Sequence, residues 1–408
     1  MSRPGPATRV DVAIVGGGLV GATLALALAP TRRSVLLIEA VPPESTGQPS
    51  FDDRCSALGN GSRRVLEMLG VWPQLRPAAT PIRGIQVSDA GHFGAARLES
   101  AELGLEAFGY VVPNRSIGAA LWRALEPAPI ARRVGARVGR VTLAADAARL
   151  DVLDAAGAVE HVEARLVVAA DGAHSQVRAA AGIDAYVQDY HQVAVIANLE
   201  AERRSGSIAH ERFTPTGPLV LLPLADGRYA VVWTLAPERA RHLLASPESG
   251  FVAALQAALG WRVGRVVTVG RRAAYPLALR RAQALTGLRA VLVGNAAQTL
   301  HPVAAQGYNL GLRDAAALAE RLAIAADPGA EAVLAGYAQS RAPDRRGMIA
   351  FTDGLVKLFG LESAPLAGLR SLGLVAFDLL PPAKRALARL SWGFGGNTPR
   401  LLRGLPLA

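Results

Sequence analysis

The sequence predicts an α/β fold in which an N-terminal βαβ unit belongs to one sheet, a second, antiparallel sheet is interleaved with it along the chain, and helices follow at the C-terminus. Three observations lead to this prediction. The chain has 408 residues, of which 51% are hydrophobic, so it can bury more than one core and is not a disordered protein. A strand, a glycine-rich turn, a helix and a second strand follow one another within residues 10–39. Short apolar runs separated by turn residues fill residues 211–235, as expected of antiparallel strands.

The βαβ unit begins with VDVAIV at residues 10–15, an apolar run typical of a buried strand. A Gly-x-Gly-x-x-Gly turn follows and opens a helical segment that ends near Leu28, and SVLLIE at residues 34–39 supplies the second strand. Residues 12–31 carry no charge. We nevertheless reject a signal peptide or a membrane span there, because four glycines would make a poor continuous helix.

The glycines of this turn have separate physical roles. Gly16 permits the tight turn, Gly18 lets the backbone approach a pyrophosphate, and Gly21 lets the helix pack against the strand. Phosphates would lie at the helix N-terminus, where free N–H groups point outward. Glu39 ends the second strand, where an acid can accept hydrogen bonds from a ribose. The unit therefore predicts a dinucleotide site, with a purely structural glycine turn as the alternative; the neighbouring residues expected at the site are Leu19, Val20 and Ala40.

Two later segments make the pattern more specific. Residues 164–182, ARLVVAADGAHSQVRAAAG, contain a strand that runs into Asp171 and Gly172. For Asp171 alone, an ordinary turn at the end of a strand would explain the pattern. Residues 291–320, VLVGNAAQTLHPVAAQGYNLGLRDAAALAE, contain Gly-Asn-Ala-Ala, then Pro, then Gln-Gly-x-Asn. Together with the N-terminal turn, these motifs resemble the single-component flavoprotein aromatic hydroxylases.

The resemblance implies that the third segment holds the ribityl chain and the isoalloxazine ring of FAD. Most relatives have Asp where this chain has Asn295, whose amide carbonyl can still accept a ribityl hydrogen bond. A helix expected from about Gln306 would direct its first amides at the pyrimidine edge of the flavin, where negative charge collects on reduction. Ala305 is a second departure, since the family usually has Gly there. The residues of this segment expected at FAD are Gly294, Asn295, Pro302, Ala305, Gln306, Gly307, Tyr308 and Asn309, in addition to Asp171 and Gly172.

The resemblance also implies FAD contacts at Arg54, Arg115 and Val138. For each arginine taken alone, a surface ion pair is the competing interpretation. The sheet formed by residues 211–235 with residues 80–110 would cover the flavin's active face, although it could also be purely structural. Its expected substrate wall consists of Phe213, Leu219, Leu221 and Pro223.

Within the family, the chain resembles the branch that hydroxylates 2-octaprenyl-6-methoxyphenol in ubiquinone biosynthesis. The stretches that carry this likeness are GNAAQTLHP at 294–302, ERFTPTGPLVLLPL at 211–224, FDDRCSALGNGSRRVLEMLGVW at 51–72 and FTDGLVKLF at 351–359. The likeness implies an FAD-dependent monooxygenase that uses NAD(P)H and O2, acts through a flavin hydroperoxide and converts a 2-polyprenyl-6-methoxyphenol to the 1,4-benzoquinol. The alternatives are hydroxylation of another ring carbon or a small phenol, a flavin reductase or oxidase, and a redox-poor assembly flavoprotein.

No catalytic side chain identifies itself in the sequence. His301 could serve as a base, but a lone histidine beside a proline is more often structural. A single Gly-x-Gly-x-x-Gly is present, so we expect NAD(P)H to bind transiently across the sheet rather than in a second domain. The chemistry would come from the cofactor, while the protein orients the ring and excludes water.

The expected domain organisation alternates between two units. The FAD-binding domain takes residues 8–75, 111–183 and 278–340, the substrate-sheet domain takes residues 76–110 and 184–277, and a helical region takes residues 341–408.

The formal net charge of +11 has three interpretations. Composition bias is one, attraction to an anionic membrane face is the second, and nucleic acid is excluded as a partner because no nucleic-acid-binding motif is present. The single cysteine, Cys55, cannot form an internal disulfide, and no Cys/His metal site is visible, so a reducing cytoplasm is expected. The tail from residue 341 either packs on the core or forms a basic amphipathic surface. A polyprenyl phenol substrate favours the surface, and with it peripheral membrane contact and a complex with other ubiquinone-biosynthesis proteins.

Overall fold

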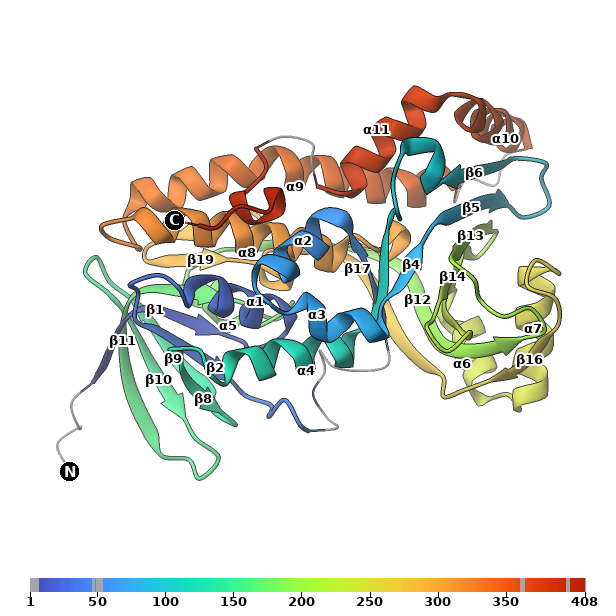
Figure 1. Ribbon diagram of the computed structural model, residues 1–408. Helices are drawn as coiled ribbons and strands as arrows, with labels where there is room; N and C mark the ends of the chain where they lie inside the picture. The colour runs from blue at the N-terminus through green and yellow to red at the C-terminus, as the bar shows by residue number, and fades with distance from the viewer. Residues whose placement is uncertain (1–6, 46–47, 49–53, 360–363, 394–396, 408) are drawn as a thin grey trace.

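The computed structural model describes residues 7–45, 48, 54–359, 364–393 and 397–407. Within this part of the chain, two large sheets stand side by side, a small sheet lies between them, and helices cover their outer faces (Figure 1). The first residues of the quoted stretch 51–72 lie outside the described residues.

The first large sheet has a parallel core in the order β19-β11-β1-β2-β8. Strand β10 extends it through antiparallel pairing with β11, β9 pairs antiparallel with β10, and β18 pairs antiparallel with β19. Its strands are β1 (Thr8–Val15), β2 (Val35–Glu39), β8 (Ala131–Val134), β9 (Arg137–Leu143), β10 (Ala148–Leu153), β11 (Val159–Ala169), β18 (Thr286–Gly287) and β19 (Ala290–Leu292). Strand β2 apart from Glu39, strand β19 and the last four residues of β1 and of β11 are apolar and buried, because helices shield the middle of the sheet, whereas the edge strand β8 has no buried residue.

Helix α1 (Leu19–Leu28) connects β1 to β2 and packs against α4 (Asn114–Leu125) and α8 (Gly307–Ile324). The predicted βαβ unit is therefore confirmed, with boundaries within two residues of those expected. The other helices near this sheet are α2 (Asn60–Met68), α3 (Trp72–Leu75) and α5 (Gln176–Ala180), with the 3-10 helices η1 (Arg76–Ala78), η3 (Gly294–Ala296), η4 (Val303–Ala305) and η5 (Arg400–Arg403).

The second large sheet is mostly antiparallel, in the order β20-β17-β12-β15-β14-β13-β5-β6, with β16 beside β12. Its strands are β5 (Gly84–Asp89), β6 (Ala95–Glu99), β12 (Ala185–Ala201), β13 (Ile208–Thr214), β14 (Gly217–Pro223), β15 (Tyr229–Leu235), β16 (Val266–Val269), β17 (Ala273–Ala282) and β20 (Gln298–Thr299). One face is buried under α6 (Pro237–Ala245) and α7 (Glu248–Leu259). The antiparallel strands expected over residues 211–235 are confirmed.

Not all of residues 80–110 join this sheet. Strands β3 (Cys55–Gly59) and β4 (Thr80–Ile82) pair with β7 (Gly109–Pro113) on either side of it in the small sheet. Strand β5 instead pairs with β13 and with β6, and η2 (Ser100–Leu103) follows β6. The chain therefore crosses from one large sheet to the other through the small one.

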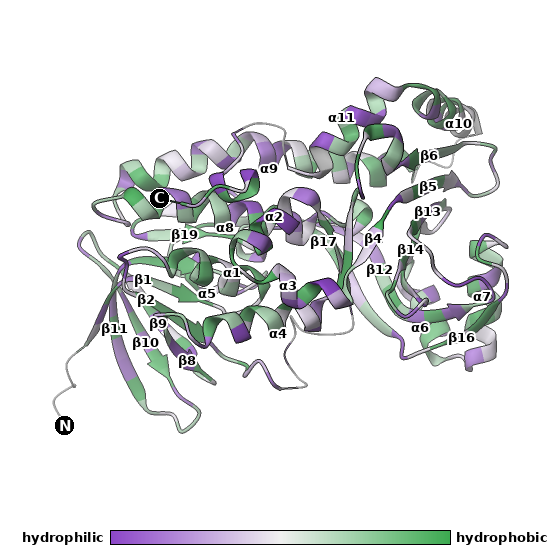
Figure 2. Ribbon diagram, in the orientation of Figure 1, coloured by the Kyte–Doolittle hydropathy of each residue, from purple (hydrophilic) through white to green (hydrophobic). Residues whose placement is uncertain are grey.

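The C-terminal part is helical, as expected. Helix α9 (Glu331–Phe359) continues through Pro343 and across the expected boundary between residues 340 and 341. Helices α10 (Ala364–Leu379) and α11 (Pro381–Ser391) follow, and α10 packs on β6. Figure 2 shows mostly hydrophobic residues along α10 and hydrophilic segments on α11. In the part of the chain that the structure describes, no helix is both long and apolar enough to cross a bilayer.

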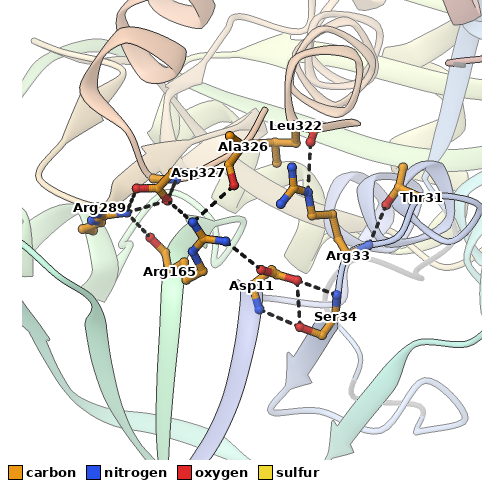
Figure 3. A network of polar contacts seen from close by, with 10 residues as sticks. Asp11, Thr31, Arg33, Ser34, Arg165, Arg289, Leu322, Ala326 and Asp327 are labelled. Carbon is orange, nitrogen blue, oxygen red and sulfur yellow. Dashed lines mark hydrogen bonds and ion pairs between the residues drawn. The ribbon is translucent and has the colours of Figure 1, made fainter. Parts of the chain in front are cut away.

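A polar network ties together the amino ends of the parallel strands (Figure 3). Asp11 accepts hydrogen bonds from Ser34, and Arg165 lies 3.4 Å from Asp11 and 3.3 Å from Asp327. Arg289 donates to Asp327 at 2.7 Å. Because these contacts join β1, β11 and the α8–α9 connection, they fix the end of the sheet opposite the glycine turn.

Candidate functional site

The glycine turn between β1 and α1 is closely packed. Gly16 has φ of +102°, and a Cβ there would overlap the carbonyl oxygen of Ala170. A Cβ on Gly21 would overlap the carbonyl oxygen of Gly16, so a glycine is required for the approach of helix to strand that the sequence predicts. Gly18 caps α1 without a side chain, and its position leaves the first amides of the helix facing a cavity.

Glu39 lies at the end of β2 beside this turn. Its carboxylate accepts hydrogen bonds from the backbone N–H of Gly17 at 2.5 Å and of Val41 at 2.8 Å, and from Gln48 Nε2 at 3.3 Å. The side chain lines the same cavity. The position of the acid beside the turn agrees with the prediction, and its hydrogen bonds also hold the turn in shape.

The second motif forms the next wall of the cavity. Asp171 Oδ2 accepts from the N–H groups of Gln176 at 2.8 Å and Val177 at 3.3 Å. Burial raises the pKa of Asp171. Its Oδ1 atom is buried and has no hydrogen-bond partner among the described residues, although the residue lines the cavity. A buried acceptor of this kind fits a ligand that carries hydroxyl donors.

Arg178 joins the second motif to the third. Ser175 caps α5 by accepting from the Arg178 N–H at 2.9 Å. The Arg178 guanidinium then donates to the carbonyl oxygens of Ala296 and Ala173, both at 3.0 Å. The two motifs are thus held together by a side chain and not only by their strands.

The third motif is anchored from behind by Asp314 of α8. Asp314 Oδ2 accepts from Gln298 Nε2 at 2.8 Å and from the Gly294 N–H at 3.4 Å. Its Oδ1 accepts from Arg341 Nε of α9 at 2.8 Å. Asn295 stays exposed and lines the cavity, as expected for a residue that contacts a ligand.

The loop before α8 has an unusual backbone. Ala304 and Ala305 have φ of +59° and +50°, in the left-handed region that favours glycine. The alanine thus occupies a conformation that glycine, the residue usual at this position in the family, adopts without strain. Asn309 donates to the carbonyl oxygens of Ala305 at 2.9 Å and Ala57 at 2.8 Å, which ties this loop to β3.

All three motifs open into one cavity of about 810 Å³ that lies between the first sheet, η4 and the second sheet. The predicted residues that line it are Gly16, Gly18, Leu19, Val20, Glu39, Ala40, Arg54, Val138, Asp171, Gly172, Asn295, Pro302, Ala305, Gly307 and Tyr308. The predicted residues outside its lining are Gly21, Arg115, Gly294, Gln306 and Asn309. Of these, Gly21, Gly294 and Asn309 shape the walls, since they pack or hydrogen-bond directly behind lining residues.

The predicted substrate wall takes the wrong face of β14. Leu219 and Leu221 are fully buried against α6 and α7, on the far face of β14. Val220 and Leu222 line the cavity instead, because side chains of a strand alternate between its two faces.

The ends of the predicted wall do not line the cavity either. Phe213 stacks on Phe359 with ring centroids 3.5 Å apart, and Pro223 lies at the end of β14. The apolar wall is completed by β5, β12, β13 and β15; its members are Ile85, Ile196, Ala209, Val220, Leu222, Ala230 and Val232.

Besides Asp171, burial shifts the pKa values of four residues that line the cavity, namely His210, Glu211, His301 and Tyr308, and two of these bear on its chemistry. Burial lowers the pKa of His301 to about 4, so the ring is neutral at pH 7, and its Nδ1 accepts from the Val303 N–H at 3.2 Å. Burial raises the pKa of Glu211 to about 7, while the nearby backbone amide of Ala304 acts in the opposite direction. The sequence analysis missed Glu211, because polarity does not single it out between His210 and Arg212.

Further residues that the sequence analysis missed line the cavity near the glycine turn. They are Gln48, Asn114, Arg137 and His174. Arg54, which was expected, lies with its guanidinium carbon 4.7 Å from the ring centroid of Tyr275. No metal-binding cluster of His, Cys, Asp or Glu is found among the described residues.

A side-chain-free cradle at a helix N-terminus, an acid at the end of the second strand and the unpartnered Asp171 Oδ1 together fit an extended dinucleotide. The fold and this site define a dinucleotide-binding α/β protein with an apolar second compartment. The chain belongs to the FAD binding domain family, whose family model matches residues 9–352. This confirms the prediction of FAD as the cofactor.

Individual relatives extend the comparison to nearly the whole chain. The chain is 40% identical to the ubiquinone hydroxylase UbiL of Rhodospirillum rubrum, with 100% of this chain and 96% of the relative covered. It is 34% identical to the 3-demethoxyubiquinol 3-hydroxylase of Escherichia coli (strain K12), with 94% and 98% covered. The crystal structure of p-nitrophenol 4-monooxygenase PnpA from Pseudomonas putida DLL-E4 has a similar fold, with a TM-score of 0.80 at 19% identity over 96% of this chain and 99% of that one. The predicted fold class is thereby confirmed.

Proposed function

We propose that this protein is an FAD-dependent monooxygenase of ubiquinone biosynthesis that hydroxylates a polyprenylated phenol. The observation that carries the proposal is the single cavity in which the dinucleotide motifs meet the apolar face of the second sheet. The names of the Rhodospirillum rubrum and Escherichia coli relatives support the same class of reaction.

The expected residues hold FAD in the following way. The amides at the start of α1 bind the pyrophosphate, Glu39 accepts from the ribose, and Asn295 accepts from the ribityl chain. The first amides of α8, at Gly307 and Tyr308, would face the flavin ring. When bound, FAD takes up a hydride from NAD(P)H and activates O2 for transfer of one oxygen atom to the ring. In the balanced reaction, a ring C–H, O2, NAD(P)H and a proton give a ring C–OH, water and NAD(P)⁺.

The side chains of the second sheet provide a dry, apolar surface for the aromatic ring. Exclusion of water there prevents loss of the activated oxygen to the solvent. We also propose that the FAD-binding domain and the substrate-sheet domain alternate along the chain as predicted above. The apolar surface supports this division, because β5, β6 and β12–β17, which come from separate segments of the chain, belong to one sheet. A transient approach of NAD(P)H to the cavity is also part of the proposal.

Our preferred substrate is a 2-polyprenyl-6-methoxyphenol, which would become the 1,4-benzoquinol. A second candidate is hydroxylation at another ring carbon, which the name of the Escherichia coli relative favours. Turnover with ¹⁸O₂ and 2-geranyl-6-methoxyphenol distinguishes them, because mass spectrometry and NMR of the product locate the new oxygen. Label para to the hydroxyl supports the preferred reaction, label at another carbon supports the second, and an unlabelled ring with consumption of NAD(P)H would exclude a monooxygenase.

A polyprenyl substrate is dissolved in the membrane, so we propose peripheral membrane contact from the cytoplasmic side through α10 and α11. Leu369, Leu372 and Leu379 of α10 are 63%, 58% and 72% exposed, and Arg385 and Arg389 of α11 are exposed beside them in sequence. Exposed leucines with nearby cations are typical of an interfacial helix. Other ubiquinone-biosynthesis proteins are proposed as partners at the same membrane.

Sedimentation with vesicles tests this contact. Anionic vesicles should bind the protein more strongly than neutral ones, and added salt should release it. Leu379→Ser should weaken binding, whereas Ile324→Ser, which changes an 81% exposed residue at the end of α8, should not. Equal binding of both variants would place the contact elsewhere.

A further inference from the structure

Glu211 is a carboxylate set into an otherwise apolar wall. On β13 it pairs with Val220 of β14 on one side and with Val87 of β5 on the other. Val220 in turn pairs with Val232 of β15, so the row of residues across the sheet at this level is apolar apart from Glu211. Because the side chain points into the cavity, it faces the compartment that the ring of the substrate would occupy.

The carboxylate has one free acceptor atom. The backbone amide of Ala304 in η4 lies close enough to the group to lower its pKa, and Oε1 is buried with no partner among the described residues. A buried carboxylate oxygen without a donor is costly, whether the group is charged or neutral. A ligand in the cavity that carries an O–H group would remove this cost.

Other titratable groups line the cavity but do not act on Glu211. They are Glu39, Arg54, Cys55, Arg137, Asp171, His174, His210, His301 and Tyr308. The pKa of Glu211 responds first to burial and then to the Ala304 amide, and neither cause is a charged side chain. The protonation state of Glu211 is therefore set by the cavity itself and by what fills it.

His301 cannot replace Glu211 as an acceptor. Its Nδ1 accepts from the Val303 N–H, so the proton of the neutral ring is on Nε2. Nε2 can then only donate. It is buried without a partner among the residues that the structure describes, and its ring stands edge-on to Tyr190 with ring centroids 5.2 Å apart. A phenol hydroxyl needs an acceptor. Glu211 Oε1 is an unpartnered acceptor on the face of β13 that carries Val220, whereas the unpartnered Nδ1 of its neighbour His210 belongs to the opposite face, the one that carries Leu221.

We propose that Glu211 is a catalytic residue whose Oε1 accepts the proton of the substrate's ring hydroxyl; this inference rests on the proposed function. The hydroxyl O–H bond breaks, its electron pair remains on the phenolic oxygen, and a new O–H bond forms on the carboxylate. No electrons are exchanged with another group. The proton transfer raises the electron density at the ortho and para carbons as they bond to the incoming oxygen atom, and it orients the ring by its hydroxyl.

Equilibrium binding to the FAD-loaded protein tests the proposal without turnover. The probes are 2-geranyl-6-methoxyphenol and its methyl ether, and Kd is measured from flavin fluorescence at pH 6 and pH 8 in the absence of NAD(P)H. A carboxyl group with a pKa of about 7 is ionised in roughly a tenth of the molecules at pH 6 and in roughly nine tenths at pH 8. Phenol binding to the wild type should therefore tighten about tenfold over this range, while the ether, which has no proton to give, should show no such change.

Two variants test whether Glu211 causes the pH dependence of phenol binding. Glu211→Gln keeps the size of the side chain and should abolish the pH dependence of phenol binding, and Glu211→Asp should keep the dependence with weaker binding. The flavin spectrum of each variant reports that the site is still formed. The inference is overturned if phenol binding is independent of pH in the wild type, or equally dependent in Glu211→Gln. Failure of the wild type to bind either probe at both pH values would instead overturn the proposed function, and the inference with it.

Discussion

Arg341 of α9 should stabilise both the fold and the FAD site, and its removal separates the two effects. Its Nε donates to Asp314 Oδ1 at 2.8 Å, and its Nη2 donates to Asp344 Oδ2 at 2.6 Å. Arg341 and Asp314 are both only 2% exposed. Asp344 keeps a second partner in Arg313 at 2.8 Å, so Arg341→Leu leaves Asp314 as the unpaired charge.

Removal of one partner from a buried ion pair costs about 3–5 kcal/mol. The entropy of unfolding of a chain of this length is roughly 0.9 kcal/mol/K, so a loss of about 4 kcal/mol lowers Tm by roughly 5 °C. FAD affinity should fall as well, because Asp314 also holds Gln298 and the Gly294 N–H of the cofactor loop.

The assay is thermal unfolding of the apoprotein together with FAD titration. Arg346→Leu is the matched control, since it makes the same substitution on an exposed residue of the same helix and should change stability by less than about 0.5 kcal/mol. Replacement of both Arg341 and Asp314 by leucine should recover most of the stability, because it removes the unpaired charge. It should not recover FAD affinity, because the loop has lost its acceptor.

The reasoning would be refuted if Arg341→Leu had the same Tm as the control variant Arg346→Leu. Recovery of FAD affinity in the double variant would show that Asp314 does not position the loop.

Three further predictions concern other parts of the site. Gly21→Ala should abolish FAD retention, because its Cβ overlaps the Gly16 carbonyl oxygen; a purified variant with a full flavin spectrum would contradict this. Val220→Ala should change KM for the phenol, whereas Leu221→Ala should lose about 2–5 kcal/mol of stability with little change in KM, and the reverse result in kinetics and unfolding would restore the predicted wall. Burial lowers the pKa of His301 to about 4, so the unfolded state takes up a proton first as pH falls from 6.5 and stability is lost toward pH 4. His301→Asn, which keeps an acceptor for the Val303 N–H, should reduce this acid loss by up to about 3 kcal/mol in denaturant titrations, and an unchanged pH profile would exclude His301 as its source.

The elements whose signals are local could be predicted from the sequence. The turn at Gly16 and the acid at Glu39 are tied to strand ends, and the position of a strand end follows from the apolar pattern around it. The resemblance supplied the cofactor loop, including Asn295, which lines the cavity as expected. These residues can be predicted without knowing which strands pair with one another.

The second sheet was harder to predict because both faces of β14 are apolar. Leu219 and Leu221 pack under helices, while Val220 and Leu222 line a cavity, and the sequence GPLVLLP contains no polar residue that distinguishes the two faces. Its neighbour β13 carries Glu211 on the cavity face, but His210 and Arg212 lie on the opposite face, so polarity does not distinguish the two faces of this strand either. The faces follow only from the packing of α6 and α7 on the sheet.

The left-handed alanines connect the cofactor loop to the wall opposite it. A left-handed conformation costs a non-glycine residue roughly 1–2 kcal/mol, so Ala304 and Ala305 need support from their surroundings. Gln306 donates to the Ala304 carbonyl oxygen at 3.1 Å, Asn309 donates to that of Ala305 at 2.9 Å, and the Ala304 amide is attracted to the Glu211 carboxyl group, whose pKa it lowers. Two of these supports are neutral amides, whereas the third is a carboxyl group that gains or loses a charge near neutral pH. A hydrogen bond to a carboxylate is stronger than one to a neutral acid, so uptake of a proton by Glu211 weakens the hold on Ala304. If Glu211 takes up the proton of the substrate, as proposed, its weaker attraction for the Ala304 amide would change the support of the loop that we propose to hold FAD, and the chemistry on one wall of the cavity would be coupled to the backbone of the other.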